Sequence, residues 1–207
     1  MKNLILFTII FAISCEDSNN YNENHNSNLL FVSSEGSYGN GDGSISVFNN
    51  NEMIQIVEEV GDVVQSIIVN NDHLFVTINN SHKIKRYTIT ESGLSLPGID
   101  IETSNSSPRE MVIVDDKLYF TNWNSRDVKV LDLVTYSIVT AITLDGVPED
   151  IVSDGDFLWV SIPMLELYDG NNGSSVLKID IESESVVATY EVGRGPEHML
   201  IENDELW

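Results

Sequence analysis

The chain repeats one short motif, a leucine followed by an aromatic residue, at a nearly constant interval. The motif occurs as LFV at 30–32, LFV at 74–76, LYF at 118–120, LWV at 158–160 and LW at 206–207. Its leucines are 44, 44, 40 and 48 residues apart. A period of this length restricts the chain to a repeat architecture, in which each unit is one supersecondary structure packed against the next.

Three further series of apolar segments follow the same period. The first precedes the motif and usually begins with proline: VVQSIIV at 63–69, PREMVIV at 108–114, PEDIVSD at 148–154 and PEHMLIE at 196–202. The second follows it: SISVF at 44–48, KIKRY at 83–87, DVKVL at 127–131 and SVLKI at 175–179. The third closes three of the units: EMIQIVEEV at 52–60, SIVTAITL at 137–144 and SVVATYEV at 185–192.

A complete unit therefore holds four short segments that favour strands, and turn-forming Asn, Asp, Gly and Ser cluster between them. Four strands in a period of about 40–45 residues are typical of a blade of a β-propeller. We predict an all-β chain, a β-propeller of four-stranded blades. The predicted units are 29–61, 62–106, 107–146 and 147–194, with a partial unit at 195–207.

The N-terminal 28 residues do not share this repeat. Residues 4–13 form an apolar run of ten, about 15 Å as a helix and too short for a hydrocarbon core of roughly 30 Å. The run and the following Ala12-Ile13-Ser14-Cys15 resemble a bacterial lipoprotein signal, so we predict a signal peptide at 1–14 and lipidation of Cys15, the only cysteine. An ordinary signal peptide with a chance cysteine is the alternative.

Residues 15–28 are polar and rich in asparagine, which predicts a disordered tether after the lipidated cysteine. Glu16 and Asp17 resemble the surface-export signal of Bacteroidetes lipoproteins. The predicted location is the outer membrane, at the cell surface or in the periplasm, with the lipid at Cys15 as the link to the membrane.

The charge of the chain excludes one class of partner. Lys and Arg number 10 against 33 Asp and Glu, a formal net charge of −23. A field of this sign repels phosphate backbones, so we expect no binding of nucleic acid through a basic surface.

The segment LYFTNWNSRDVKVLD at 118–132 resembles the YVTN-type repeat of surface-layer and Bacteroidetes surface propellers. The opening LFVSSEGSYGNGDGSISVF at 30–48 is similar to that of the Bacteroidetes lipoproteins. Relatives of this kind usually have seven blades, on the order of 330 residues at this period. The resemblance therefore implies that the four units are a fragment of a seven-bladed ring; a four-bladed ring is the alternative.

The same resemblance implies a ligand site at the mouth of the central channel, where the proline-led segments begin. We align Gln65, Glu110, Asp150 and His198 at one position there, and Val64, Arg109, Glu149 and Glu197 one residue earlier. Tyr38, Trp123 and Tyr168 fall in loops nearby and could stack on a flat ligand. Either these polar residues contact a ligand, or a solvated channel mouth simply tolerates them. Trp159 and Trp207 occupy the motif itself, and we expect them to pack in the core.

Signals for metal ions and cofactors are few. The four histidines lack the paired spacing of a zinc site, so we predict no metal site and no cofactor. The glycine-rich stretches at 39–44 and 169–175 are typical of hairpin turns that could bind Ca²⁺ loosely.

Three functions remain open. The first is a surface-anchored binding module that captures a small molecule, a corrinoid for example, for an outer-membrane transporter. The second is a lyase or lactonase that uses His198 with the channel carboxylates, because PEDIVSDGDFLW at 148–159 resembles the repeat of streptogramin-lyase-like propellers. The third is a structural surface-layer or adhesion role.

Overall fold

The computed structural model describes residues 29–203 and 205–207, and these residues form an all-β protein. The predicted signal peptide, Cys15 and the tether lie outside the described residues. Within the described part, no helix is long and apolar enough to cross a membrane.

Eighteen strands of the described residues group into four antiparallel sheets and one terminal hairpin. Blade 1 contains β1 (Leu29–Ser34), β2 (Ser44–Asn49) and β3 (Glu52–Val57). Blade 2 contains β4 (Val64–Asn70), β5 (His73–Ile78), β6 (Lys83–Thr90), the short β7 (Gly93–Leu94) and β8 (Ile99–Glu102). Blade 3 contains β9 (Pro108–Val114), β10 (Lys117–Asn122), β11 (Asp127–Asp132) and β12 (Ser137–Thr143). Blade 4 contains β13 (Ile151–Ser153), β14 (Phe157–Ile162), β15 (Ser175–Asp180) and β16 (Ser185–Glu191). The hairpin consists of β17 (Ile201–Glu202) and β18 (Glu205–Leu206).

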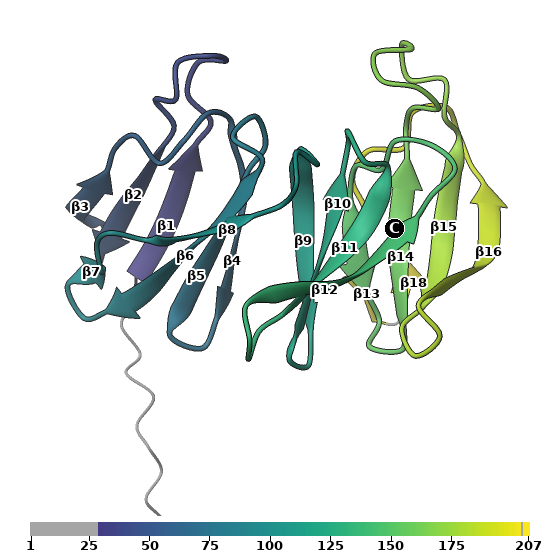
Figure 1. The fold of residues 1–207 in the computed structure, drawn as a ribbon. Helices are drawn as coiled ribbons and strands as arrows, with labels where there is room; N and C mark the ends of the chain where they lie inside the picture. Colours follow the sequence, from purple (N-terminus) through teal and green to yellow (C-terminus); the bar gives the residue numbers. More distant parts are fainter. Residues whose placement is uncertain (1–28, 204) are drawn as a thin grey trace, which may run out of the picture.

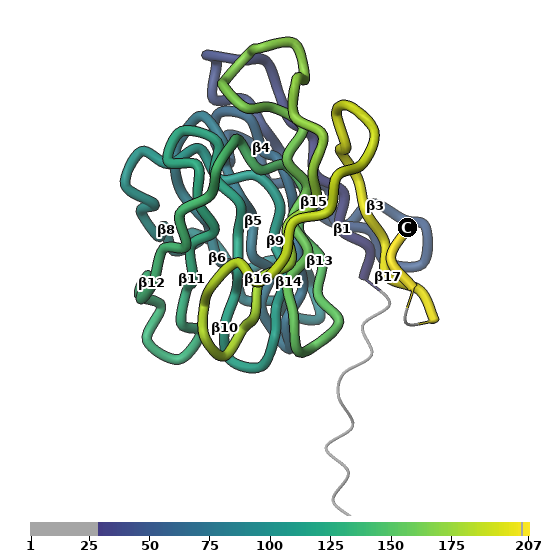
Figure 2. Tube along the Cα trace, turned by 90° about the vertical axis from the view of Figure 1, so that its right-hand side faces the viewer, coloured from purple at the N-terminus to yellow at the C-terminus, as the bar shows by residue number. Residues whose placement is uncertain are grey.

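The sheets are the blades of a β-propeller, as the repeat predicts, and they form an arc with blade 1 and blade 4 at its two ends (Figure 1). The loop between β1 and β2 and the loop between β14 and β15 project at the same end of the arc, the top of Figures 1 and 2. We call this end the upper face.

The Leu-aromatic motif explains how the blades pack. Neighbouring residues of a strand point to opposite faces of the sheet, so one motif serves two interfaces. Leu74 is fully buried in the cluster shared with blade 1, whereas Phe75 is buried in the cluster shared with blade 3. In blade 3, Leu118 faces blade 2 and Tyr119 faces blade 4. Each leucine therefore packs toward the preceding blade and each aromatic residue toward the following one.

Two expectations from the sequence need correction at the end of the arc. Trp207 is 70% exposed, and Trp159 is only half-buried, on the face of blade 4 that no further complete blade covers in the described part of the chain. The packing expected of these tryptophans requires a following blade, which gives the aromatic side of the motif its partner.

Blade 2 also has a fourth strand that the sequence pattern did not indicate. β8 pairs with the first half of β6, and the short β7 pairs with its end. The insertion of β7 between β6 and β8 interrupts the spacing on which the prediction of the other outer strands rested.

Candidate functional site

The inner strands of blades 2 and 3 begin at the upper face with the same irregularity. The pairing of β4 with β5 shifts between Val64 and Ser66, and the pairing of β9 with β10 shifts between Phe120 and Asn122. These shifts are β-bulges, which re-aim side chains where pairing starts. Residues at the beginning of the inner strands are therefore turned out of the regular alternation.

A buried hydroxyl group defines the register of each bulge. Thr77, Thr121 and Ser161 are fully buried. They accept hydrogen bonds from the backbone N–H groups of Ser66 (3.0 Å), Glu110 (3.1 Å) and Asp150 (3.0 Å), respectively. Ser66, Glu110 and Asp150 are thus equivalent. Gln65 is therefore equivalent to Arg109 and Glu149, whereas the alignment from sequence pairs it with Glu110, one residue away.

The same hydroxyl groups connect each blade to the next. Thr77 Oγ1 donates to the carbonyl oxygen of Arg109 at 2.8 Å, and Thr121 Oγ1 donates to that of Glu149 at 2.7 Å. Ser161 Oγ donates to the carbonyl oxygen of Glu197 at 2.9 Å. We call these three contacts the blade latches. They hold the backbone of the candidate site residues in place from below.

The side chains at the equivalent positions meet across the blades. Arg109 Nη1 donates to Gln65 Oε1 at 2.5 Å. The guanidinium group also forms an ion pair with Glu149, to which Nε donates at 3.1 Å and Nη2 donates as well. The side chains of Arg109 and Glu149 are 15% and 9% exposed. One nearly buried cation thus joins blades 2, 3 and 4.

Trp123 forms a wall of this network. Its Nε1–H donates to Glu149 Oε2 at 2.8 Å, and the Arg109 guanidinium lies over its ring at 4.0 Å from the centroid. The ring of Tyr168 meets Trp123 edge-on, with the centroids 6.3 Å apart. Tyr168 itself is 81% exposed, so the aromatic pair reaches from the network into solvent.

Glu110 and Asp150 add carboxylates beside the network. Burial raises the pKa of Glu110 above its ordinary value, and the charges of Asp150 and Glu149 act in the same direction. A hydrogen bond from Gln65 Nε2 to Glu110 Oε1, 3.4 Å long, opposes that shift. Asp150 is buried, and its carboxylate accepts the backbone N–H groups of Ile151 and Met199. Such a site favours ligands that are neutral or cationic and rich in hydrogen-bond donors.

The remaining predicted residues lie at the margin of this network. Tyr38, in the loop between β1 and β2, is 79% exposed. Glu197 is exposed, and its Oε1 accepts a bond from Asn171 Nδ2 at 3.4 Å. His198 is exposed next to Met199, the residue that donates to Asp150. Hydrogen bonds connect Gln65, Arg109 and Glu149 to one another, and they extend to Trp123 and Glu110. None of these hydrogen bonds includes Tyr38, Glu197 or His198.

The glycine-rich loops are closed by their own aspartates. Asp42 Oδ1 accepts the N–H of Ser37 at 2.6 Å. Asp169 accepts hydrogen bonds from the backbone N–H groups of Asn172, Leu165 and Glu166. These contacts, that of Asn172 above all, hold the pKa of Asp169 below its ordinary value. Within residues 29–203 and 205–207, no group of three or more His, Cys, Asp or Glu is placed to hold a metal ion.

Sequence reasoning missed the latch residues and the loop anchor Asn122. Asn122 is fully buried and bonds to Ser106, to the carbonyl of Phe120 and to that of Asp127. The signal that could have found the latches is a hydroxyl residue three positions after each leucine of the motif, as in LFVT, LYFT and LWVS. The Thr-Asn pair of the YVTN-like segment thus has a structural role, because Thr121 latches blade 4 and Asn122 fixes the loop that carries Trp123.

Comparison with known proteins supports the fold. No protein-family model matches the chain, and no curated protein matches it. Hydrazine synthase from Kuenenia stuttgartiensis is 18% identical with a TM-score of 0.62, over 75% of this chain and 45% of its own. A 6-phosphogluconolactonase-like protein from Bacteroides uniformis is 15% identical with a TM-score of 0.64, over 86% and 59%. The dihydro-heme d1 dehydrogenase NirN, solved in complex with DHE, is 14% identical with a TM-score of 0.60, over 83% and 38%.

These solved structures are β-propeller-like, and the chain spans about half of their length. At this level of identity the likeness concerns the fold, and a propeller hosts binding proteins and enzymes alike.

Proposed function

We propose that the chain is a ligand-binding propeller of the YVTN type, anchored as a surface lipoprotein through Cys15, and that its site is the upper-face network around Arg109 and Trp123. The observation that carries the proposal is the convergence of three blades on one charged, nearly buried group: Gln65, Arg109 and Glu149 come from equivalent positions and contact one another. Burying a charged side chain is unfavourable because the side chain loses its hydration. Nearly buried charged groups therefore cluster at functional sites, where their fixed orientation is used.

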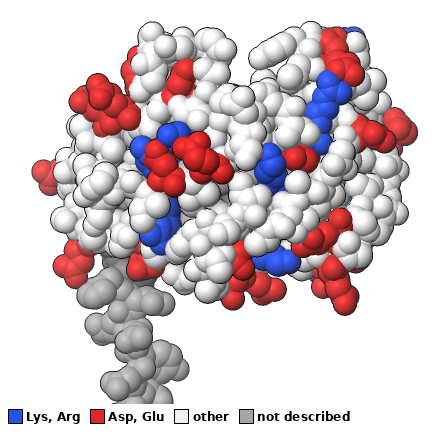
Figure 3. All heavy atoms as spheres, viewed as in Figure 1, with Lys and Arg blue, Asp and Glu red and all other residues white. Residues whose placement is uncertain are grey.

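The chemistry of the site indicates the class of ligand. The carboxylates of Glu110 and Asp150 accept hydrogen bonds, and the rings of Trp123 and Tyr168 offer an apolar surface. Acidic side chains also line the edges of the face seen in Figure 3, whereas basic ones such as Lys83 and Lys85 lie beside an acidic partner, Asp100. A neutral or cationic ligand with a flat apolar part and several N–H or O–H donors fits these groups.

Corrinoids are one ligand of this description, because they combine a flat macrocycle with peripheral amides. Capture of such a nutrient for an outer-membrane transporter is the role that suits a lipid-anchored binding module. Sugars and basic peptides belong to the same panel, since they also bring donors to carboxylates and apolar faces to aromatic rings.

Thermal unfolding with each ligand class tests the proposal. A ligand at 100 times its dissociation constant stabilises the folded state by about 2.7 kcal/mol. We expect one class to raise the melting temperature of the protein. Tyr168→Ser should abolish this rise, because it removes one of the two rings that offer an apolar surface to the ligand. The variant should still fold, since Tyr168 is exposed and contributes little to the fold. Leu96→Ser, at a residue 58% exposed in blade 2, is the matched control that keeps the rise. Absence of stabilisation by every class contradicts ligand capture and favours a structural surface role.

An enzymatic role is the second proposal, and one contact favours it. The backbone N–H of Met199 donates to Asp150 Oδ2 at 2.6 Å, so the segment that carries His198 is held at a channel carboxylate. His198 and Asp150 would then act as an acid–base pair on a neutral lactone or a similar ring; the acidic surroundings disfavour a phosphorylated one. His198→Ala should abolish lactone turnover while the melting temperature is unchanged, and unchanged turnover removes His198 from the mechanism.

A further inference from the structure

Two asparagines of the chain are followed directly by glycine: Asn40 in the loop between β1 and β2, and Asn172 in the loop between β14 and β15. Because glycine has no side chain to shield its backbone nitrogen, that nitrogen can attack the side-chain amide of a preceding asparagine. Both pairs belong to the glycine-rich stretches at 39–44 and 169–175, and both asparagines are exposed. The two loops nevertheless differ in whether the reacting atoms are free.

The reacting atoms of Asn172 and Gly173 are held by the fold. The backbone N–H of Gly173 donates to the carbonyl oxygen of Pro163 at 2.8 Å. Asn172 Nδ2 donates to the carbonyl oxygen of Asp169 at 2.6 Å, and the backbone N–H of Asn172 donates to Asp169 Oδ1 at 3.1 Å. Gly173 is also packed so closely that a Cβ placed on it would clash with the carbonyl oxygen of Ile162. The nitrogen and the amide therefore cannot approach each other until these contacts open.

The corresponding atoms of Asn40 and Gly41 have no such contacts. The backbone N–H of Asn40 donates to the carbonyl oxygen of Ser37 at 3.0 Å, but this group takes no part in the reaction. Within the described part of the chain, neither the N–H of Gly41 nor the side-chain amide of Asn40 forms a hydrogen bond. A Cβ placed on Gly41 would meet nothing within 4 Å. The nitrogen of Gly41 can therefore turn toward the Asn40 amide without displacing a neighbour.

The loop that carries Asn40 is fixed on both sides of it. The Asp62 carboxylate accepts the backbone N–H of Gly39 at 2.9 Å. The N–H of Gly43 donates to the carbonyl oxygen of Gly61 at 3.0 Å. These contacts come from the segment that leads into blade 2, and the loop between them projects from the upper face (Figure 2). The lack of contacts at the Asn-Gly pair is therefore local to the tip of one anchored loop.

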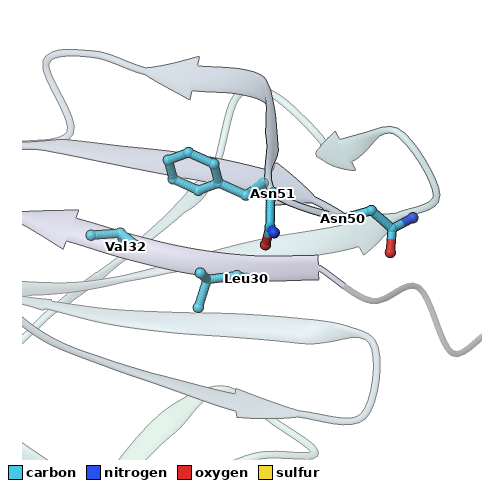
Figure 4. Close-up of a pocket in the computed structure, with 5 residues that line it drawn as sticks. Leu30, Val32, Asn50 and Asn51 are labelled. Carbon is cyan, nitrogen blue, oxygen red and sulfur yellow. The ribbon is translucent and has the colours of Figure 1, made fainter.

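Exposure alone does not make an asparagine reactive, as the turn between β2 and β3 illustrates. Asn50 and Asn51 are exposed there, at the edge of a hollow of about 500 Å³ that Leu30 and Val32 also line (Figure 4). The residues that follow them are Asn51 and Glu52, whose side chains hinder an attack by the backbone nitrogen. Asn50 and Asn51 therefore serve as internal controls for exposure.

We propose that Asn40 is a site of spontaneous deamidation and that the fold protects Asn172 from the same reaction. The nitrogen of Gly41 loses its proton and forms a bond to Cγ of Asn40. The bond between Cγ and Nδ2 breaks, and Nδ2 leaves with the proton as ammonia. Water then opens the cyclic imide. Opening at the main-chain carbonyl leaves isoaspartate, with the backbone running through Cγ, whereas opening at Cγ leaves aspartate.

The modified loop differs from the original one in charge and in length. Either product adds a negative charge two residues from Tyr38, in a loop that already contains Asp42. Isoaspartate also adds a methylene to the backbone between the anchors at Gly39 and Gly43, so the path of the loop must change. The reaction does not depend on the ligand proposed above, and it produces two forms of the upper face from one chain.

Peptide mapping by mass spectrometry tests the proposal on the full chain in mild detergent at pH 8. We expect Asn40 to gain one mass unit and to yield isoaspartate, at a rate that rises with pH because the attacking nitrogen must lose its proton. Asn172 should react at least about tenfold more slowly, since two of its hydrogen bonds must open first. Asn50 should remain unchanged over the same time. In urea, where the loop contacts are lost, the two Asn-Gly pairs should react at similar rates.

Isoelectric focusing of two matched variants assigns the modified residue. Unmodified and deamidated chains differ by one charge, so we expect a more acidic band that grows with time. Asn40→Gln should prevent this band, because the glutamine side chain is one methylene too long to close the imide ring readily, whereas Asn172→Gln should leave it unchanged. No reaction at Asn40, equal rates at Asn40 and Asn172 in the folded protein, a difference that persists in urea, or an acidic band that Asn40→Gln leaves unchanged would each overturn the proposal.

Discussion

The guanidinium carbon of Arg109 lies 4.0 Å from the centroid of the Trp123 ring, and both side chains bind the same carboxylate, that of Glu149. A cation stacked on a ring and paired with a carboxylate is fixed in direction by two different interactions. Blade 4 therefore determines the position of an arginine and a tryptophan that both belong to blade 3.

Replacement of Arg109 by methionine should destabilise the protein strongly. The change leaves Glu149 charged and nearly buried without its partner, a loss of about 3 kcal/mol. Adding Glu149→Gln should restore most of the loss, since a neutral amide still accepts the Trp123 N–H. Urea unfolding of the single and double variants measures this coupling, and equal losses in both would contradict it. Arg126→Met is the control: its ion pair with Glu166 is largely exposed, and such pairs contribute less than about 1 kcal/mol.

Thr121→Val should destabilise the junction between blades 3 and 4. Valine matches threonine in shape but cannot donate to the Glu149 carbonyl or accept the N–H of Glu110. Leaving two such groups unsatisfied inside the protein costs about 1–3 kcal/mol. Thr143→Val, at an exposed position of β12, should be nearly neutral in the same denaturation experiment. A loss below about 0.5 kcal/mol at Thr121 would refute the role of the latch.

Lys129→Met should weaken the junction between blades 2 and 3. Lys129 is buried, and its Nζ donates to the carbonyl of Thr103 at 3.1 Å and to Ser125 Oγ at 3.2 Å. Methionine keeps the volume but leaves the Thr103 carbonyl without this donor and the nearly buried Asp127 carboxylate, 3.7 Å from Nζ, without its cation, at a cost of about 1–3 kcal/mol. Lys117→Met provides the comparison, because Lys117 is 40% exposed and water can replace its contact with Glu184. Similar melting temperatures for the two variants would contradict the prediction.

The sequence alone predicted the blades well because their determinants are local and periodic. The motif around Leu118 and Tyr119 specifies a strand that is buried on both faces, and its repetition specifies the radial stack. The outer strand β8 of blade 2 escaped prediction, since the inserted β7 separates it from β6 and moves it out of the spacing of the other outer strands.

The candidate site was predicted as a set of residues but not as a network. A bulge shifts the alignment of Gln65 by one residue, and a bulge depends on the pairing of two strands that no periodicity records. The same reason hides the roles of Thr77 and Thr121: their partners lie in the next blade.

Glu110 provides a prediction on pH. Burial, the largest effect, raises its pKa above the ordinary 4.5. The folded protein therefore holds the Glu110 proton more tightly than the unfolded chain, and this group lowers stability as pH rises from about the ordinary value through the folded pKa. Above the folded pKa the deficit is constant. Glu110→Gln removes it and keeps an acceptor for Gln65, so the variant should be more stable than the wild type at pH 7, with the difference shrinking toward pH 4.

Asp132 gives the opposite sign and serves as the control for this experiment. The N–H and hydroxyl groups of Thr135 hold the pKa of this partly exposed carboxylate below the ordinary 3.8. Its stabilising contribution is present above that value and is lost as pH falls through the folded pKa. Asp132→Asn should therefore be less stable than the wild type at pH 7 and approach it in strong acid. Urea titrations between pH 3 and pH 8 compare the two variants directly. If the stability gained by Glu110→Gln grew toward low pH instead of shrinking, the burial of Glu110 would not be the cause of its shifted pKa.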